Sequence, residues 1–226
     1  MILIGISDLH GYLPSIPRFD LLVIAGDICP VVNHGVRYQE DWIFHKFIPW
    51  LKNLEYNDEF SKVIFIGGNH DKIFEKKSKV GEVITLETRG NAIFLQDSEY
   101  NFVNTEVDWK IYGTPYCHIF GNWSFMKSDE KLKEIYSRIP ENLDILITHD
   151  VPYNTNCDYT QFGKLRHVGN EVLREAILEK KPRINICGHL HDPINNIEDT
   201  LGDTKIYNVA SVDELYQLKE NYYSII

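Results

Sequence analysis

One pentapeptide, Gly67-Gly68-Asn69-His70-Asp71, carries side chains with distinct chemistry directly after an apolar run. The preceding residues, 63–66, are apolar and partly β-branched, which is typical of a buried strand. Consecutive glycines allow a sharp exit from a strand and a close approach of the backbone to a ligand. The asparagine amide oxygen can bind a metal, and the histidine is suited to acid or base catalysis. By itself, the motif fits equally well with side chains that satisfy the hydrogen bonds of a turn.

Four other apolar runs end in the same way, in residues that bind metals. The runs cover 2–6, 21–26, 145–148 and 184–188, and the residues that follow them are Asp8 and His10, Asp27, His149, and His189 and His191. In open α/β sheets, sites form at the carboxyl ends of strands, so five such strands predict one shared cluster. Residues i and i+2 of an extended segment project to the same side, so each paired set can reach that cluster.

The length and composition predict one domain over residues 1–226. The chain is 43% hydrophobic, which is enough for one large core, and it contains no low-complexity linker. No run of eighteen uncharged apolar residues is present, so we expect no membrane span. Met1 leads directly into a predicted strand without a basic leader segment, and we therefore expect a cytoplasmic location.

The net charge limits the partners that we expect, and the cysteine spacing indicates the state of the thiols. A formal net charge of -10 disfavours long nucleic acid, which requires many phosphate neutralisations. A small anionic substrate remains compatible with this charge, because bound metals can reverse its sign locally. The cysteines have no paired spacing, which predicts ordinary thiols, and they are Cys29, Cys117, Cys157 and Cys187.

The apolar spacing predicts the helices that surround the cluster. Residues 36–54 have helical spacing, and Pro49 is expected to kink that helix. Ser128 and Asn170 are candidate N-caps, the second for a helix over 171–180 that precedes the strand before Gly188.

Strand-rich segments complete the predicted architecture. The runs 83–86, 92–95 and 107–112 are short and alternating, and we expect them to form a second sheet. Residues 205–212 and 222–226 are expected to complete the sheets. Alternating β and α units around a strand-rich middle predict an α/β fold with two packed sheets flanked by helices.

The motifs together resemble those of a known family. Asp8-x-His10, Gly26-Asp27, Gly68-Asn69-His70-Asp71, Thr148-His149 and Gly188-His189-x-His191 occur in the order found in calcineurin-like metallophosphoesterases. Residues 111–115, 139–149 and 208–211 further resemble the MPPED-like branch, which includes class III cyclic-nucleotide phosphodiesterases. The resemblance implies a four-layer αββα sandwich of two mixed β-sheets flanked by helices.

This resemblance implies a metal-dependent hydrolase with two divalent transition-metal ions. The implied ligands are Asp8, His10 and His191 for one metal, Asn69, His149 and His189 for the other, and Asp27 as the bridge. Four imidazoles among these ligands favour Mn, Fe, Zn or Co over magnesium alone. The implied nucleophile is a hydroxide between the metals. His70 is expected to act as the general acid or to stabilise a phosphoryl oxygen, while Asp71 either orients His70 or caps the next segment.

The chain departs from the related phosphoprotein phosphatases beside Asp27. Their Gly-Asp-x-x-Asp-Arg pattern places an aspartate and an arginine where this chain has Pro30 and Val31, which disfavours phosphoprotein substrates. The residues that could compensate are Asn33, His34 and Arg37.

The leading interpretation is a phosphodiesterase for a small diester such as a cyclic nucleotide. The alternatives are a phosphomonoesterase for a nucleotide or other small phosphate ester, and a non-catalytic protein-binding scaffold on the same fold. Tyr116 and Trp123 are candidates to stack on a base, with a core position as the alternative for both, whereas Phe120 is expected in the core. The oligomeric state is left open.

Overall fold

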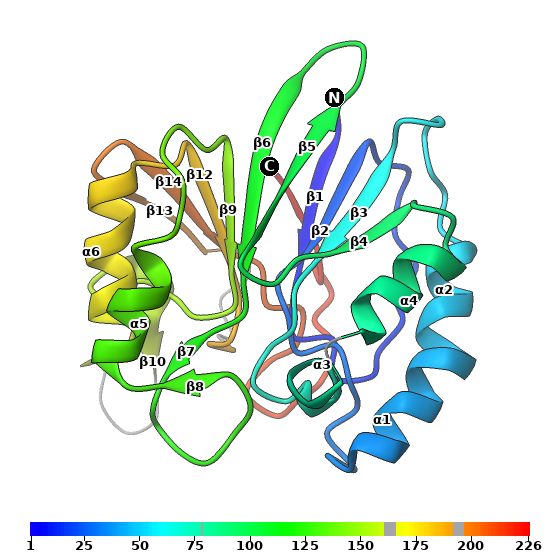
Figure 1. Cartoon of the computed structure of the whole chain (residues 1–226), viewed down its shortest axis with the longest axis horizontal. Coiled ribbons are helices and arrows are strands. Elements are labelled where there is room, and N and C mark those ends of the chain that lie inside the picture. Colours follow the sequence, from blue (N-terminus) through cyan, green and yellow to red (C-terminus); the bar gives the residue numbers. More distant parts are fainter. Residues whose placement is uncertain (78, 161–165, 192–196) are drawn as a thin grey trace.

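Two mixed β-sheets pack face to face, and helices cover their outer faces (Figure 1). The computed structural model describes residues 1–77, 79–160, 166–191 and 197–226. In the first sheet the strand order is β15-β1-β2-β3-β4, and in the second it is β13-β14-β12-β9-β6-β5. The predicted αββα sandwich is therefore confirmed.

The first sheet is parallel from β1 to β4, and β15 pairs antiparallel with β1. Its strands are β1 (Leu3–Ile6), β2 (Leu21–Ile24), β3 (Lys62–Phe65), β4 (Ala92–Phe94) and β15 (Ser224–Ile225). On its outer side lie α1 (Val36–Trp42), the π-helical turn η1 (Ile43–Phe47), α2 (Ile48–Lys52), α3 (Lys72–Lys76) and α4 (Val80–Glu87) (Figure 1).

The second sheet is parallel through β14, β12, β9 and β6, with antiparallel strands at both edges. Its strands are β5 (Ser98–Val103), β6 (Asp108–Thr114), β9 (Ile145–Thr148), β12 (Ile184–Cys187), β13 (Ile197–Leu201) and β14 (Thr204–Asn208). Helices α5 (Asp129–Tyr136) and α6 (Glu171–Lys180) cover its outer face (Figure 1). The remaining short elements are β7 (Cys117–His118), β8 (Met126–Lys127), η2 (Asn156–Asp158), β10 (Tyr159–Thr160) and β11 (Arg166–His167).

The central strands are mainly apolar because both of their faces are covered. In β2, Leu22 and Ile24 pack under the helices, while Leu21 and Val23 pack against the other sheet. This alternation follows from the two-residue period of a strand. The resulting core holds the carboxyl ends of the strands rigidly in place.

Two expectations about residues 83–95 were wrong. Residues 83–86 lie in α4, where Val80 and Ile84 are buried on one helical face. Four residues are too few to separate a period of 2 from one of 3.6, and the apolar partner at Val80 lies outside the run. Residues 92–94 form β4, which pairs with β3 in the first sheet, so the strand belongs there and not to the second sheet.

The predicted helical segments are found with local changes. The segment 36–54 is helical over 36–52, with the π-helical turn η1 before Pro49, which lacks an N–H donor and lies in the first turn of α2. Asn170 caps α6 by accepting the Leu173 N–H at 3.0 Å. Ser128 occupies the N-cap position of α5 without a side-chain capping bond.

The cysteines form no disulfide bonds among the described residues. The cysteines expected to be ordinary thiols are free and buried, and burial raises the pKa of the Cys29 thiol well above its usual value. In the part of the chain that the structure describes, no helix is long and apolar enough to span a membrane.

Candidate metal centre

The loops after β1 and β2 lie side by side because their backbones are hydrogen-bonded. Asp8 N–H donates to the Gly26 carbonyl and His10 N–H to the Asp27 carbonyl, both at 2.9 Å. The loops after β9 and β12 are joined in the same way, by Gly188 N–H and the His149 carbonyl at 3.2 Å. The neighbouring strands thus bring the predicted residues to one place between the two sheets.

Each of the two buried aspartates uses one oxygen for the backbone and directs the other toward imidazole nitrogens. Asp8 Oδ2 accepts the His189 N–H at 2.9 Å, and Asp8 Oδ1 lies 3.1 Å from His191 Nε2. Asp27 Oδ1 accepts the His70 N–H at 2.7 Å. The backbone therefore fixes the orientation of both carboxylates.

The second oxygen of Asp27 lies at the middle of the histidine cluster. Asp27 Oδ2 is 3.3 Å from His149 Nε2 and 3.9 Å from the Nε2 atoms of His10 and His70. His149 Nδ1 lies 2.8 Å from the Ala25 carbonyl, so that nitrogen donates to the backbone and Nε2 is directed into the cluster. Asp27 Oδ2 therefore faces the imidazole nitrogens of three histidines.

The donor atoms fall into two overlapping groups. Asp8, His10 and His191 form one group, and Asp8, Asp27 and His149 form the other, with the atoms of each group within 4.8 Å of one another. The first group has the members that the family resemblance implied for one metal, whereas the second joins Asp27 and His149 to Asp8. Asn69 and His189 complete the neighbourhood.

Asn69 and His189 both lie beside His149. Asn69 Oδ1 is 3.0 Å from His149 Nε2, so the amide oxygen is directed toward the same space. The ring of His189 has its centroid 5.1 Å from that of His149. Asn69 and His189 therefore both contact a member of the cluster. His189 is not part of either compact donor group.

The backbone is strained at the residues of this cluster. Positive φ angles occur at Asp8 (54°), His10 (44°), Asp27 (51°) and His189 (69°). Each such non-glycine residue costs on the order of 1–3 kcal/mol and persists only where its surroundings enforce it. Gly188 allows its backbone to lie close to Asp8 and Ser7, because a Cβ atom there would overlap Asp8 Oδ2 and Ser7 Oγ. Local strain of this kind is concentrated at functional sites.

The charges of the cluster call for cations. Burial acts to raise the pKa of Asp8 and Asp27, but the neighbouring histidines lower both well below the usual value. Burial lowers the pKa of His10 and of His189 to about 4. At His149 burial acts downward, but the Asp27 charge and hydrogen bond raise the pKa to about 10. The ionised carboxylates and the neutral imidazoles of His10 and His189 are in the ligand state that divalent transition metals require, whereas His149 must release a proton when it binds a metal.

The comparison with known proteins decides the family. The family described as calcineurin-like phosphoesterase matches residues 2–193. The chain belongs to this family. Its members are metal-dependent phosphoester hydrolases that use divalent ions, and the donor set described above fits that requirement.

Relatives and solved structures agree with this membership. Metallophosphoesterase domain-containing protein 1 of Homo sapiens is 30% identical over 94% of this chain, and the chain spans 66% of that relative's length. An uncharacterized protein of Methanocaldococcus jannaschii is 27% identical over 98% of this chain and 94% of its own length. Phosphopantetheinyl hydrolase from Mycobacterium tuberculosis superposes with a TM-score of 0.60 at 14% identity, covering 100% of this chain and 95% of that structure, which shows a shared fold.

His70 of this calcineurin-like phosphoesterase lies at the edge of the cluster. Its N–H is held by Asp27 and its carbonyl accepts the Gln39 Nε2–H at 2.7 Å, so the backbone is fixed on both sides. Its Nε2 is directed toward Asp27, while Nδ1 lies 2.7 Å from His34 Nε2. The predicted catalytic side chain therefore has one ring nitrogen facing Asp27 and the other facing His34.

Aromatic side chains surround the cluster. Trp123 packs on His70 with ring centroids 4.6 Å apart and is 41% exposed. The expectation that Phe120 lies in the core was wrong, because it is half-exposed and packs on His189 at 4.9 Å. Tyr116 is half-buried, packs on Phe125, and joins two apolar clusters, which favours its core alternative.

Tyr216 is a site neighbour that the sequence did not reveal. Its ring lies 4.8 Å from His10 and 5.0 Å from His191, and Tyr12 OH donates to its carbonyl at 3.2 Å. No motif marks this tyrosine, because it comes after the last strand-end motif and reaches the cluster only through the fold. The half-exposed Tyr216 ring therefore contacts two of the predicted ligands.

Asp71 connects two of the loops that carry the site. Its carboxylate accepts N–H groups from Ile28 (3.0 Å), Cys29 (2.8 Å) and Gly68 (2.9 Å). Burial and the charge of Asp27 raise its pKa to about 6 even with these donors. Of the two predicted roles, neither a bond to His70 nor a side-chain cap of α3 is seen among the described residues. Asp71 instead fixes the Asp27 loop to the Gly68 loop.

We expect Asp71→Ala to lower the free energy of unfolding of the metal-free protein by about 3–6 kcal/mol, because three buried N–H donors lose their acceptor. Urea unfolding measures the change. Glu175→Ala, at an exposed position of α6, is the control and should alter stability by no more than about 0.5 kcal/mol. A loss below about 1 kcal/mol for Asp71→Ala would show that water replaces the carboxylate.

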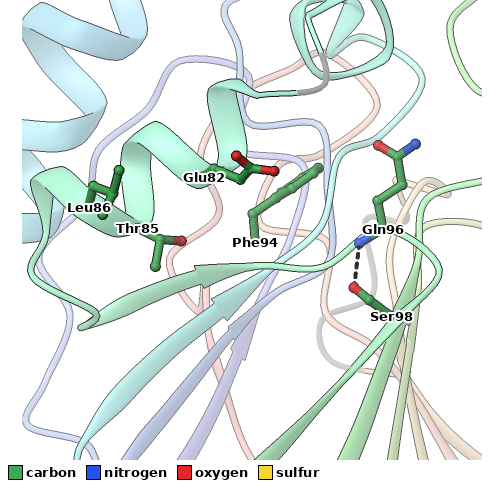
Figure 2. Close-up of a pocket in the computed structure, with 6 residues that line it drawn as sticks. All are labelled: Glu82, Thr85, Leu86, Phe94, Gln96 and Ser98. Atoms are coloured by element: carbon green, nitrogen blue, oxygen red, sulfur yellow. Dashed lines mark hydrogen bonds between the residues drawn. The ribbon is translucent and has the colours of Figure 1, made fainter.

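A separate cavity of about 570 Å³ lies between α4 and the strands β4 and β5 (Figure 2). Its lining residues are Glu82, Thr85, Leu86, Phe94, Gln96 and Ser98. None of the predicted site residues lines it, and it contains no histidine or cysteine. This cavity is therefore separate from the cluster of predicted site residues.

Proposed function

We propose that this protein is a binuclear phosphodiesterase that hydrolyses a small diester. The observation that carries the proposal is the position of Asp27 Oδ2 between His10 and His149, which belong to the two predicted metal sites. A single carboxylate oxygen within reach of both ligand sets supports a shared, bridging role. The family membership supports the hydrolytic reaction.

The chain's own residues supply the ligands and one proton. The proposed ligands are Asp8, His10 and His191 for the first ion, Asn69, His149 and His189 for the second, and Asp27 for both. When bound, two dications supply positive charge for the phosphate and lower the pKa of a coordinated water. His70 Nε2 is directed toward the same space, where a proton on it can be donated to the leaving alkoxide.

The charges around the cluster support a diester in preference to a monoester. Among the described residues, the ion pairs of Asp8 and Asp27 are all with histidines. A monoester dianion normally requires extra cationic donors, typically a bidentate arginine. Arg37, which was a candidate for this role, is exposed. A diester carries one negative charge fewer and requires fewer such donors.

A substrate panel tests the proposal on protein reconstituted with Mn²⁺. We expect kcat/KM for bis-p-nitrophenyl phosphate to exceed that for p-nitrophenyl phosphate by about tenfold or more, which corresponds to about 1.4 kcal/mol of transition-state stabilisation. Cyclic nucleotides are assayed in parallel. A monoester preferred tenfold would support the phosphomonoesterase alternative, and a metal-loaded protein without any hydrolysis would support the scaffold.

Trp123 is the side chain we propose for contact with the second ester group. We expect Trp123→Ala to raise KM for a cyclic nucleotide by about tenfold or more, because stacking on a base contributes about 1–3 kcal/mol. The small aryl diester should show a smaller change. Tyr116→Ala is the matched control, since its ring packs on Phe125, and we expect it to lower thermal stability while leaving the preference between the two diesters unchanged. Equal changes in both KM values for Trp123→Ala would exclude base stacking.

A further inference from the structure

His34 and His70 form a pair of imidazoles outside the donor groups. His34 Nε2 lies 2.7 Å from His70 Nδ1, which is hydrogen-bond distance. The residues come from different loops, one after β2 and one after β3, and are separated by 36 positions. The contact is therefore made by the fold and is independent of local turn geometry.

The other contacts of His70 fix its backbone and one face of its ring. Its backbone is held on both sides by Asp27 and Gln39, and Trp123 covers the ring face at a centroid distance of 4.6 Å. Trp123 also contacts the ring of His34, at 5.2 Å. The indole thus contacts both rings of the pair and restricts their movement from one side.

The loop that carries His34 is shaped for this contact. Asn33 Oδ1 accepts the Gly35 N–H at 2.8 Å, which forms a turn around His34. Asn33 thereby has a local role, and Arg37 is exposed on α1. Of the three residues able to compensate for the missing carboxylate beside Asp27, His34 is the one that reaches His70.

We propose that His34 is a positioning residue that accepts the Nδ1–H of His70 and so holds His70 Nε2 toward the reacting ester. The proposal rests on the phosphodiesterase function proposed above. In the step, the Nε2–H bond of His70 breaks, its proton goes to the leaving alkoxide oxygen, and the neutral ring retains its proton on Nδ1. His34 does not change its own protonation and does not touch substrate.

The pair differs from a histidine held by a carboxylate. Burial and the neighbouring His70 lower the pKa of His34, which favours its neutral form. A neutral acceptor orients the ring without adding a negative charge beside Asp27, whose carboxylate already serves the metal sites. Orientation by a neighbouring hydrogen bond is also the usual means of fixing the tautomer of a functional histidine.

Two substitutions separate hydrogen bonding from packing. His34→Phe keeps an aromatic ring against Trp123 but removes the acceptor, and we expect a loss of about 10–100-fold in kcat for an alkyl diester with KM little changed. His34→Gln retains an acceptor and should recover most of the activity. His45→Phe, on the exposed face of η1, is the control and should have no effect.

A spectroscopic measurement tests the pair without turnover. In metal-free protein, long-range ¹H–¹⁵N spectra should show His70 as one tautomer with the proton on Nδ1, and His34→Phe should produce a mixture that His34→Gln reverses. An unchanged His70 signal in His34→Phe, or equal kcat losses for His34→Phe and His34→Gln, would overturn the pair. If the wild-type protein hydrolyses no phosphodiester, the function fails, while the spectra still decide whether His34 sets the tautomer.

Discussion

Asp27→Asn is expected to abolish metal loading and activity together. The substitution preserves the shape of the side chain and an acceptor for the His70 N–H, but it removes the negative charge next to His10 and His149. We expect kcat/KM to fall by at least about 10³-fold, since one group that stabilises transition-state charge contributes about 10²–10³-fold and this one serves both proposed metals. Elemental analysis should show the bound metal falling from two ions toward none.

The same variant should be less stable than the wild type when both are free of metal at neutral pH. Pairing with the buried imidazole of His149 lowers the pKa of Asp27 and raises that of His149, so Asp27→Asn removes a stabilising charge pair. Added Mn²⁺ should raise the Tm of the wild type, because binding to the folded state alone contributes about 2.7 kcal/mol at a hundredfold excess over Kd. A variant that keeps two ions and full activity would show that Asp27 is not the bridge.

His70→Ala is expected to reduce the rate strongly while leaving metal content unchanged. The backbone N–H that donates to Asp27 remains, so the carboxylate stays fixed, and only the ring directed toward the cluster is lost. We expect a loss of about 10²–10⁴-fold for an alkyl diester, the range for a general acid. A p-nitrophenyl ester should lose less, because its leaving group needs little protonation.

The comparison of leaving groups gives this prediction its control. His167→Ala serves as a matched histidine deletion, because that ring lies beside Asp158 and packs on Tyr153. This variant should leave the ratio of the rates for the alkyl diester and the p-nitrophenyl ester unaltered. Equal losses for both esters in His70→Ala would mean that the ring stabilises charge on the phosphoryl group and transfers no proton.

The sequence predicted the elements that depend on local pattern. The strands before Asp8, Asp27, Asn69, His149 and His189 are present, because continuous apolar runs ending in glycine and polar residues indicate strands buried on both faces. Asn170 caps α6 as expected, since a cap requires only its own next three residues. The convergence of the strand ends followed from the rule that sites form at the carboxyl edge of parallel sheets.

Local pattern failed where its signal was too short. Residues 83–86 were predicted to form a strand but are helical. Over four positions, β-branched residues are compatible with a strand or a helix, and the packing of α4 decides between the two. Phe120 was predicted to lie in the core because large aromatic side chains are usually buried. Its loop instead places the ring against His189 at the surface.

Only the tertiary structure decided which atoms meet. The sequence specifies that Asp27 and His70 lie at strand ends, but the direction of each oxygen and ring nitrogen depends on hydrogen bonds between loops 43 residues apart. Tyr216 reaches His10, and His34 reaches His70, through contacts that no spacing along the chain encodes. The physical reason is that periodicity reports which face of an element is buried, whereas side-chain geometry depends on the packing of elements distant in sequence.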